Sequence, residues 1–390
     1  MKLVKTVVQS YKPEPKLLDL MEQFRRMVNL SIGTGLETGS TSLKGLSMQC
    51  YHQLKVFRTR SQYRICAISR AAGILKNYRN LSRKHKVRTP YCRRAGLTIC
   101  YGLKITDNGL SLPGGFHIPL NNYVMSVLGT PGYGIRSATL TLSRIGISFS
   151  KETTPVIQSK GMLGVDINLN NVTGADSLGN ILVHDLSKVT RIKAASRRTV
   201  ARFTRDDARI RREIAGKYGR IQRHRTQWLI HNVSRKLVDH AKTNSLSIVL
   251  ENIKGIRSLY RKGNGQGRYY RGRLNTWSFH EIGRQVSYKT LWEGLGVVFV
   301  NPQGTSSRCS VCGDRMVFSK ESRTLHCPTC RVDVDRDVNG ARGVLSAGLR
   351  FSLLGLSGEA VMGNPSTMVI PGVDDSQSSL EKLSTEQPKT

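Results

Sequence analysis

The sequence predicts a mixed α/β chain with at least two domains, the second of which carries a metal-binding insert. Three observations lead to this prediction. The first part of the chain has a strand pattern, then helical patterns, then β patterns, whereas strands and helices alternate after about residue 160. Two Cys-x-x-Cys pairs lie between the last expected strand and the last expected helix. The 390 residues are enough for two or more domains with buried cores.

The charge of the chain indicates the class of partner. It has 61 Lys and Arg against 26 Asp and Glu, a formal net charge of +35. This excess is far larger than solubility requires, so nucleic acid is the expected partner. A membrane is not expected, because no apolar run approaches about twenty residues. The first residues, MKLVKTVVQSYKPEPK, are unlike a secretory signal, and the paired cysteines suit a reducing compartment.

The N-terminal residues predict one strand followed by three helices. Residues 2–11 are rich in β-branched side chains and end before Pro13 and Pro15. The first helix has its apolar face at Leu17, Leu20, Met21, Phe24 and Val28, the second follows a Gly/Thr/Ser loop around residues 33–42, and the third is marked by Tyr63, Ala67, Ala71, Ile74, Leu75 and Tyr78. We interpret residues 13–85 as a helical insert.

A β module is expected around this insert. Asn108-Gly109, between two short apolar runs, is a strong hairpin signal. The alternation from Ser137 to Leu142 predicts a strand, with a turn near Gly146 before the next one. Because the first strand of the chain needs a partner, we interpret residues 1–12 and 86–157 as one module, a β-barrel that contains that strand.

The second part of the chain alternates strands and helices. GMLGVDINLNNVTGADSLGNILV predicts three strands, with Asp166 on the first, and SLSIVLENI predicts a buried strand that ends at Glu251. Helical faces are expected at Ile230, Val233, Leu237 and Ala241 and again at Trp277, Ile282, Val286 and Leu291, and a strand at 297–300. After Phe351 the composition turns polar, so residues 353–390 are expected to be a disordered tail.

Three basic stretches are candidates for nucleic-acid contact. Residues 79–94 form a charge run with tyrosines at its edges, and 188–220 is a helical pattern with twelve Lys and Arg against three acidic residues. Residues 256–274 form a basic, Gly-rich loop in which Tyr269 and Tyr270 are suited to stacking on bases. Each stretch could equally be a solvated surface, but the charge of the whole chain favours contact.

The cysteine spacing predicts a zinc ribbon at residues 306–331. Cys309, Cys312, Cys327 and Cys330 form two knuckles separated by fourteen residues, which allows four thiolates to converge tetrahedrally on one zinc ion. A set of reduced, buried cysteines is the alternative, and Gly313 after the first knuckle favours the ribbon. Four cysteine ligands leave no open position for a substrate, so this zinc would be structural.

Three acidic residues are candidates for a catalytic metal site. Asp166, Glu251 and Asp337 stand on a first strand, at the end of a later strand and at the start of the last helix. Each has an ordinary explanation as a turn, edge or cap residue. Together with a β-β-β-α-β-α-β-α order they match the RNase H-like fold, in which carboxylates lie side by side and require divalent cations between them. Two Mg²⁺ ions about 4 Å apart would suit phosphodiester hydrolysis.

Several motifs resemble the TnpB family, the OrfB-type nucleases of bacterial and archaeal insertion sequences, which are related to the type V CRISPR effectors. The motifs are GVDINLNN, IVLENIKGI, LNTWSFHEIGRQVSYKTLWEGLGVVFVNP leading into TSSRCSVCG, and CPTC followed by DRDVNGA. They extend from about residue 160 to 347. The part before them resembles the family only in its architecture.

The resemblance implies an RNA-guided DNA endonuclease that binds a noncoding RNA from the end of the mobile element and cuts double-stranded DNA. It implies a WED-like β module with a helical recognition insert, a RuvC-like nuclease domain at 158–305 and 332–352, and a prokaryotic, cytoplasmic, nucleoid-associated protein. It also selects Asp337 over Asp333 and Asp335 as the third magnesium ligand.

The sequence departs from the family pattern in two places. Arg331 stands where Gly commonly follows the second knuckle, and Gly340 and Gly343 replace better helix formers, which suggests a weaker last helix. Two other functions remain open: a nucleic-acid-binding regulator that does not cut, and a transposase that transfers DNA strands with three acids on the same fold. The guide RNA, the target-adjacent motif and the oligomeric state do not follow from the sequence.

Overall fold

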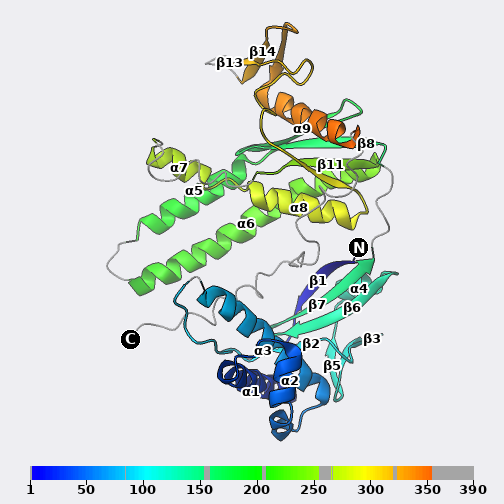
Figure 1. The fold of residues 1–390 in the computed structure, drawn as a ribbon, viewed down its shortest axis with the longest axis vertical. Helices are drawn as coiled ribbons and strands as arrows, with labels where there is room; N and C mark the ends of the chain where they lie inside the picture. Colours follow the sequence, from blue (N-terminus) through cyan, green and yellow to red (C-terminus); the bar gives the residue numbers. More distant parts are fainter. Residues whose placement is uncertain are drawn as a thin grey trace. The chain divides into compact units, whose positions relative to one another are not determined.

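The computed structural model describes residues 2–83, 85–152, 159–203, 208–253, 265, 267–318 and 323–353 (Figure 1). The chain divides into two compact units, the first formed by Met1–Glu152 and the second beginning at Thr153. Each unit is described by itself. The expected disordered tail lies outside the described residues from residue 354 onward. No helix in the described part of the chain is long and apolar enough to cross a membrane.

The helices of the first unit are α1 (Pro15–Glu37), α2 (Leu43–Cys50), the 3-10 helix η1 (Gln53–Phe57) and α3 (Ser61–Ser82). The expected apolar faces of α1 and α3 are buried, with Phe24 and Tyr63 each 1% exposed. Helix α1 continues through residues expected to be a loop. The reason is packing: Gly35 lies directly against Leu75 of α3, where a side chain would not fit.

The strands of the first unit form two open sheets. One has the order β1 (Lys2–Ser10), β7 (Arg144–Glu152), β6 (Tyr133–Leu140), β2 (Leu97–Ile99), and the other has the order β3 (Lys104–Thr106), β4 (Gly109–Leu112), β5 (Phe116–Pro119). Helix α4 (Asn122–Leu128) follows β5. The first strand does pair with the later β module, as expected.

Two expectations for this module are wrong. The described strands do not close into a barrel, because β3, β4 and β5 pair only with one another and leave β1 and β2 at the edges of the larger sheet. The expected turn near Gly146 is also misplaced. The chain turns between Thr141 and Arg144, whose backbones are hydrogen-bonded, and Gly146 lies inside β7.

The second unit is built on a five-stranded sheet with the order β10 (Ile181–Asp185), β9 (Asn171–Asp176), β8 (Gly161–Ile167), β11 (Leu246–Glu251), β12 (Val297–Val300). The pairs β8–β9 and β9–β10 are antiparallel, whereas β11 runs parallel to both β8 and β12. The helices are α5 (Ser187–Ala201), α6 (Ala208–Thr243), α7 (Arg268–Leu274), α8 (Phe279–Trp292) and α9 (Arg336–Leu353). The expected mixed α/β class is confirmed.

Two helices of this unit differ from expectation. The end of the basic segment and the following amphipathic helix are one continuous helix, α6, because no Pro or turn signal interrupts them. The described end of the expected Gly-rich loop forms a short helix, α7. The rest of that loop, residues 254–264 and 266, lies outside the described residues.

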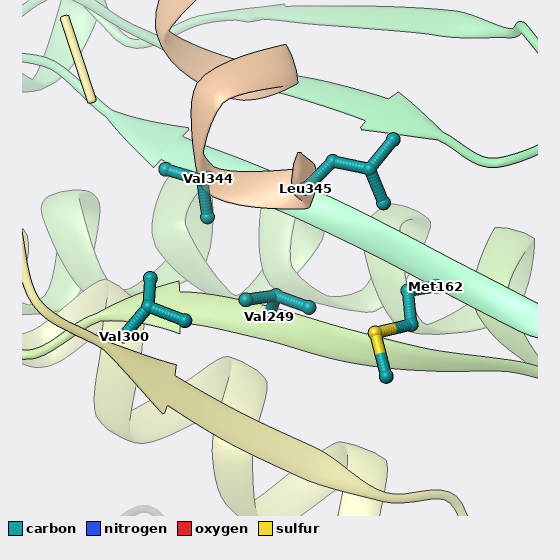
Figure 2. Close-up of a cluster of buried hydrophobic side chains, with 5 residues drawn as sticks. All are labelled: Met162, Val249, Val300, Val344 and Leu345. Carbon is teal, nitrogen blue, oxygen red and sulfur yellow. The ribbon is translucent and has the colours of Figure 1, made fainter. Parts of the chain in front are cut away.

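Helix α9 packs on one face of the sheet, with α6 and α8 on the other (Figure 1). Figure 2 shows the apolar contact, in which Val344 and Leu345 of α9 lie over Met162 of β8, Val249 of β11 and Val300 of β12. Gly164 permits the close approach: a Cβ atom there would lie 2.6 Å from the carbonyl oxygen of Ala341 and would overlap the backbone of Leu345. The helix therefore rests on the strands without a side chain between them.

We expect Gly164→Ala to displace α9 from the sheet and to lower the free energy of unfolding of the second unit by about 1–3 kcal/mol, the usual cost of overpacking. Gly216→Ala is the matched control, because Gly216 lies within α6 with no atom near its missing Cβ. That control should raise stability by roughly 0.5–1 kcal/mol, since Gly is a poor helix former. Urea unfolding measures both, and equal stability of the two variants would contradict this packing.

Candidate metal centres

Asp166 and Glu251 lie at the same end of adjacent parallel strands. Val165 of β8 is in register with Leu250 of β11, and each acid is the next residue along its strand. Because strand side chains alternate, Asp166 shares a face with Met162 and Glu251 shares a face with Val249. Both acids therefore stand on the face that α9 covers, beyond the apolar cluster of Figure 2.

Asp337 reaches the same place from the first turn of α9. It is 5% exposed, and Asp166 is 7% exposed. Gly340, one turn further along α9, lies against Asp166, so that a Cβ atom at Gly340 would be 2.7 Å from the Asp166 Oδ2. Gly343 packs on the backbone of Thr305 in the same manner. The glycines that seemed to weaken this helix are thus places where it approaches the sheet and the following loop.

The other two acids of the DVDRD run have different environments. Asp335 accepts hydrogen bonds at its Oδ1 from the backbone N–H groups of Asp337 (2.8 Å) and Val338 (3.2 Å), so it caps the start of α9. Asp333 is exposed and contacts His326 in the neighbouring strand β14 (Thr324–Cys327) at 2.9 Å. Of the three, Asp337 is the one that lies buried beside Asp166 and Glu251.

Four polar residues hold the three carboxylates. The Asn168 amide donates to the Asp166 Oδ2 at 2.8 Å, and the Thr305 hydroxyl donates to the Glu251 Oε1 at 2.5 Å. Asp337 accepts from the Asn171 amide at 2.5 Å and forms an ion pair with Arg323. None of these four residues was predicted from the sequence as part of the site, although Asn168, Asn171 and Thr305 lie inside the motifs quoted above. Arg323 had no such signal because it lies between the two knuckles.

The carboxylates repel one another in a poorly solvated place. Burial is the largest cause that raises the pKa of Asp166, and the charges of Glu251 and Asp337 act in the same direction; against the hydrogen bond from Asn168, the pKa rises to about 7. Burial also raises the pKa of Glu251, against the hydrogen bond from Thr305. A cation bound between the three carboxylates would relieve this repulsion.

The donor set at this place is suited to a hard divalent cation. It consists of carboxylate and amide oxygens, which Mg²⁺ prefers over sulfur and imidazole. The Asn171 Oδ1 beside Asp337 is buried and accepts no hydrogen bond within the described residues, which leaves a further acceptor oxygen at the site. The ligand atoms of the three carboxylates do not all lie within 4.8 Å of one another. Among the described residues, the four cysteines considered below are the group that meets this distance.

The four cysteines of the two knuckles could hold a metal ion. Their sulfur atoms all lie within 4.8 Å of one another, with 4.0 Å between Cys309 and Cys330 and 3.5 Å between Cys312 and Cys327. A tetrahedral zinc site with bonds of about 2.3 Å has sulfur atoms about 3.8 Å apart. Burial of the Cys309 thiol opposes its ionisation, but hydrogen bonds from the backbone N–H groups of Cys312 and Val311 and from the thiols of Cys327 and Cys312 together lower its pKa to about 7.

A backbone hydrogen bond closes the turn at each Cys-x-x-Cys pair. Residues Gly313 and Arg331 follow the two Cys-x-x-Cys pairs, and each N–H donates back to the carbonyl of the first cysteine of its pair. Both have a positive φ, 85° for Gly313 and 53° for Arg331. Arg331 thus adopts the left-handed conformation that Gly adopts more easily. The departure from the family pattern changes the residue but not the turn.

One residue connects the cysteine group to the carboxylates. Asn339 of α9 is 1% exposed. Its amide donates to the carbonyl of Arg308 at 2.9 Å, and its Oδ1 accepts from the N–H of Ser310 at 3.1 Å. These two residues flank Cys309. The first knuckle is therefore fixed to α9 two residues after Asp337.

The comparison with known proteins agrees with these motifs. Residues 279–344 match the family model described as the Cas12f1-like TNB domain. The chain is 28% identical over 205 residues to the TnpB-like protein MJ0751 of Methanocaldococcus jannaschii, covering 49% of this chain and 70% of that protein. It is also 28% identical over 214 residues to the putative RNA-guided DNA endonuclease InsQ of Escherichia coli K12, covering 51% and 52% of the two chains.

Two further relatives extend the likeness to CRISPR effectors. The endodeoxyribonuclease Cas12f2 of a Micrarchaeota archaeon is 28% identical over 209 residues, which is 48% of this chain and 37% of that protein. A solved structure of the Cas12f1-sgRNA-target DNA complex has a TM-score of 0.55 and 13% identity, covering 84% of this chain and 82% of that one, and so shares the fold. The sequence matches span about half of this chain. The resemblance expected from the motifs is confirmed: this chain is similar to TnpB-like proteins and to Cas12f effectors.

Proposed function

We propose that the protein is an RNA-guided DNA endonuclease of a mobile element that hydrolyses phosphodiesters with two Mg²⁺ ions in an RNase H-like, RuvC-type domain. The observation that carries the proposal is the gathering of Asp166, Glu251 and Asp337 at one end of the sheet. Their mutual repulsion has no structural benefit, so a site for cations is its best explanation.

Each carboxylate has a neighbour that fixes it for metal binding. Asn168 and Thr305 each occupy one oxygen of Asp166 and Glu251, which orients the acid and leaves its other oxygen for an ion. Arg323 and Asn171 hold Asp337. Two Mg²⁺ ions bound here would supply activation of the attacking water and stabilisation of the departing 3′ oxygen.

The charge of the chain supports nucleic acid as both guide and substrate. A guide RNA reads the target by base pairing, so the protein needs mainly contacts to phosphates, which a net charge of +35 supplies. The names of InsQ and Cas12f2 describe an RNA-guided DNA endonuclease and an endodeoxyribonuclease. We extend this activity to the present chain, with RNA from the element end as guide and double-stranded DNA as target.

The cysteine group is proposed to bind one structural zinc ion. Asn339 connects this group to α9, so the zinc would help to place Asp337. Without the ordered knuckle, the buried Asn339 amide would lose both of its hydrogen-bond partners. Arg323 adds a second link, since it precedes β14 and pairs with Asp337.

Asp337→Asn should abolish Mg²⁺-dependent DNA cleavage by the purified protein–RNA complex, with a loss of at least about a thousandfold, because a ligand to the ions is removed. Asp166→Ala should do the same while RNA binding remains. Asp333→Asn is the matched control from the same run of acids, and it should cut normally because Asp333 is exposed and its side chain pairs with His326, away from the other acids.

The products of this cleavage assay distinguish the nuclease from the regulator and the transposase. Cleavage by the Asp166→Ala complex would refute the nuclease assignment. An intact protein that binds RNA but never cuts would be the regulator, and joined element ends in the products would indicate a strand-transferring transposase. Sequencing the RNA that copurifies with the protein supplies the guide needed for this assay.

Mg²⁺ binding should weaken as the pH falls through about 7, because a proton then competes for Asp166, whose pKa is raised to about 7. A raised carboxyl pKa means that the metal-free protein loses stability as the pH rises through that value. The rise in melting temperature on adding Mg²⁺ should therefore be larger at about pH 8.5 than at about pH 6. Asp166→Asn should abolish this difference, and an unchanged difference would contradict the site.

Elemental analysis of the purified protein should find about one zinc ion per chain, removed by a chelator only with loss of folded structure. Cys309→Ser should lose the zinc. Cys100→Ser, an exposed cysteine in the first unit, should retain it. A folded, zinc-free protein would refute the zinc assignment.

A further inference from the structure

A pocket of about 620 Å³ in the second unit is not accounted for by either metal centre. It lies where α5, α7 and the turn between β8 and β9 meet, and Figure 1 shows α7 beside α5. Its lining includes three arginines, Arg191, Arg197 and Arg273, together with Tyr269 and the uncharged polar residues Asn170, Thr190 and Thr276. Among the described residues, no carboxylate lines it. The pocket is therefore open and positively charged.

Two basic side chains of α5 connect this helix to α7 and the residues after it by hydrogen bonds. The Lys193 ammonium donates to the Thr276 carbonyl at 2.8 Å and to the Ser278 hydroxyl at 2.6 Å. The Arg197 guanidinium donates to the Gly272 carbonyl at 3.0 Å. Cations are favoured at these carbonyls because they lie at the negative end of α7. Lys193 and Arg197 thus build the pocket, which leaves Arg191 and Arg273 to act on a ligand.

Arg191 and Arg273 have no direct ion pair within the described residues. Both are exposed, and neither makes an ion pair with a carboxylate in the described part of the chain. Arg191 donates to the Ser187 hydroxyl at 2.8 Å and interacts electrostatically with Asp185, which is itself hydrogen-bonded to Ser187. Guanidinium groups placed in this way are suited to a phosphate, which accepts two parallel hydrogen bonds from each.

Tyr269 and Tyr270 are neighbours in sequence but differ in position. Tyr269 lines the pocket and is 85% exposed, whereas Tyr270 is 49% exposed and does not line it. An aromatic ring this exposed beside guanidinium groups is the arrangement on which nucleic-acid bases stack. The structure thus distinguishes two tyrosines that the sequence left equivalent.

The pocket shares a wall with the proposed magnesium site. Asn170, in its lining, belongs to the four-residue turn that also supplies Asn168 to Asp166 and Asn171 to Asp337. Cα atoms two residues apart are separated by no more than about 7 Å. A strand whose phosphate lies at the carboxylates would therefore place a neighbouring nucleotide at the pocket.

We propose that this pocket binds a nucleotide of single-stranded DNA next to the phosphodiester that is cut, with its base stacked on Tyr269 and its phosphate held by Arg191 and Arg273. The position relative to the cut rests on the proposed nuclease function. The binding of single-stranded DNA does not, since it needs neither metal nor hydrolysis.

The test measures binding of fluorescein-labelled oligothymidylate to the full-length protein in EDTA, which prevents cleavage. Tyr269→Ala should raise the Kd about tenfold, as expected for one lost stacking contact, and Tyr269→Trp should restore it. Tyr270→Ala is the matched control and should bind like the wild type. An equal Kd for the two alanine variants would overturn the proposal.

The phosphate contact is tested by the salt dependence of the same binding. Arg273→Ala should reduce the slope of log K against log salt by about 0.7, the value for one phosphate of a single strand. Arg198→Ala is the control, because Arg198 is an exposed arginine of α5 that does not line the pocket. Its slope should stay near that of the wild type. Equal slopes for the two variants would remove the phosphate from the proposal and overturn it.

A crosslinking experiment tests whether the pocket binds DNA or RNA. It also separates this proposal from the nuclease assignment. An oligothymidylate containing 5-iodouracil should crosslink to Tyr269 on irradiation, and oligouridylate should compete weakly. Crosslinking only by the RNA oligomer would overturn the assignment to DNA. If Asp337→Asn still cuts, the nuclease proposal fails while crosslinking to Tyr269 is unaffected. If the Tyr269 variants bind normally while Asp337→Asn is inactive, the pocket alone is wrong.

Discussion

The close contact between α9 and the five-stranded sheet is the constraint on which the second unit depends. Apolar side chains on both elements exclude water, and the missing side chain at Gly164 lets the helix backbone rest on β8 (Figure 2). This contact determines how far the start of α9 lies from the ends of β8 and β11. A helix displaced by one methyl group would carry Asp337 away from Asp166 and Glu251. The apolar packing and the polar site are therefore consequences of the same geometry.

The polar site is unfavourable by itself. Its acids are buried together, and the pKa of Asp166 shows that the protein resists ionising all of them. Hydrogen bonds from Asn168, Thr305 and Asn171 orient the acids without removing their charge. If the proposed cation site is correct, the protein exchanges stability for cation affinity, as is common at functional sites.

The cysteine group and the basic pocket extend this site in two directions. The knuckle at Cys309 is fixed to α9 through Asn339, so a bound metal would hold the helix start from outside the sheet. The turn between β8 and β9 connects the acids to the pocket. Two of its asparagines contact Asp166 and Asp337, and a third lines the pocket. Short polar motifs thus connect the proposed catalytic site to the cysteine group and to the surface where a strand would enter.

The sequence by itself determined the strands and helices with strong periodicity, the cysteine pairs and the acids worth considering. These follow from local pattern and spacing, which need no knowledge of distant residues. The closure of the first β module was predicted wrongly, because pairing between strand edges depends on which strands find partners elsewhere. Only the tertiary structure showed why Gly340 and Gly343 are glycines, which of three nearby aspartates is buried and which of two adjacent tyrosines lines a pocket. Each of these depends on what lies opposite a residue in space, and residues that meet there are far apart along the chain.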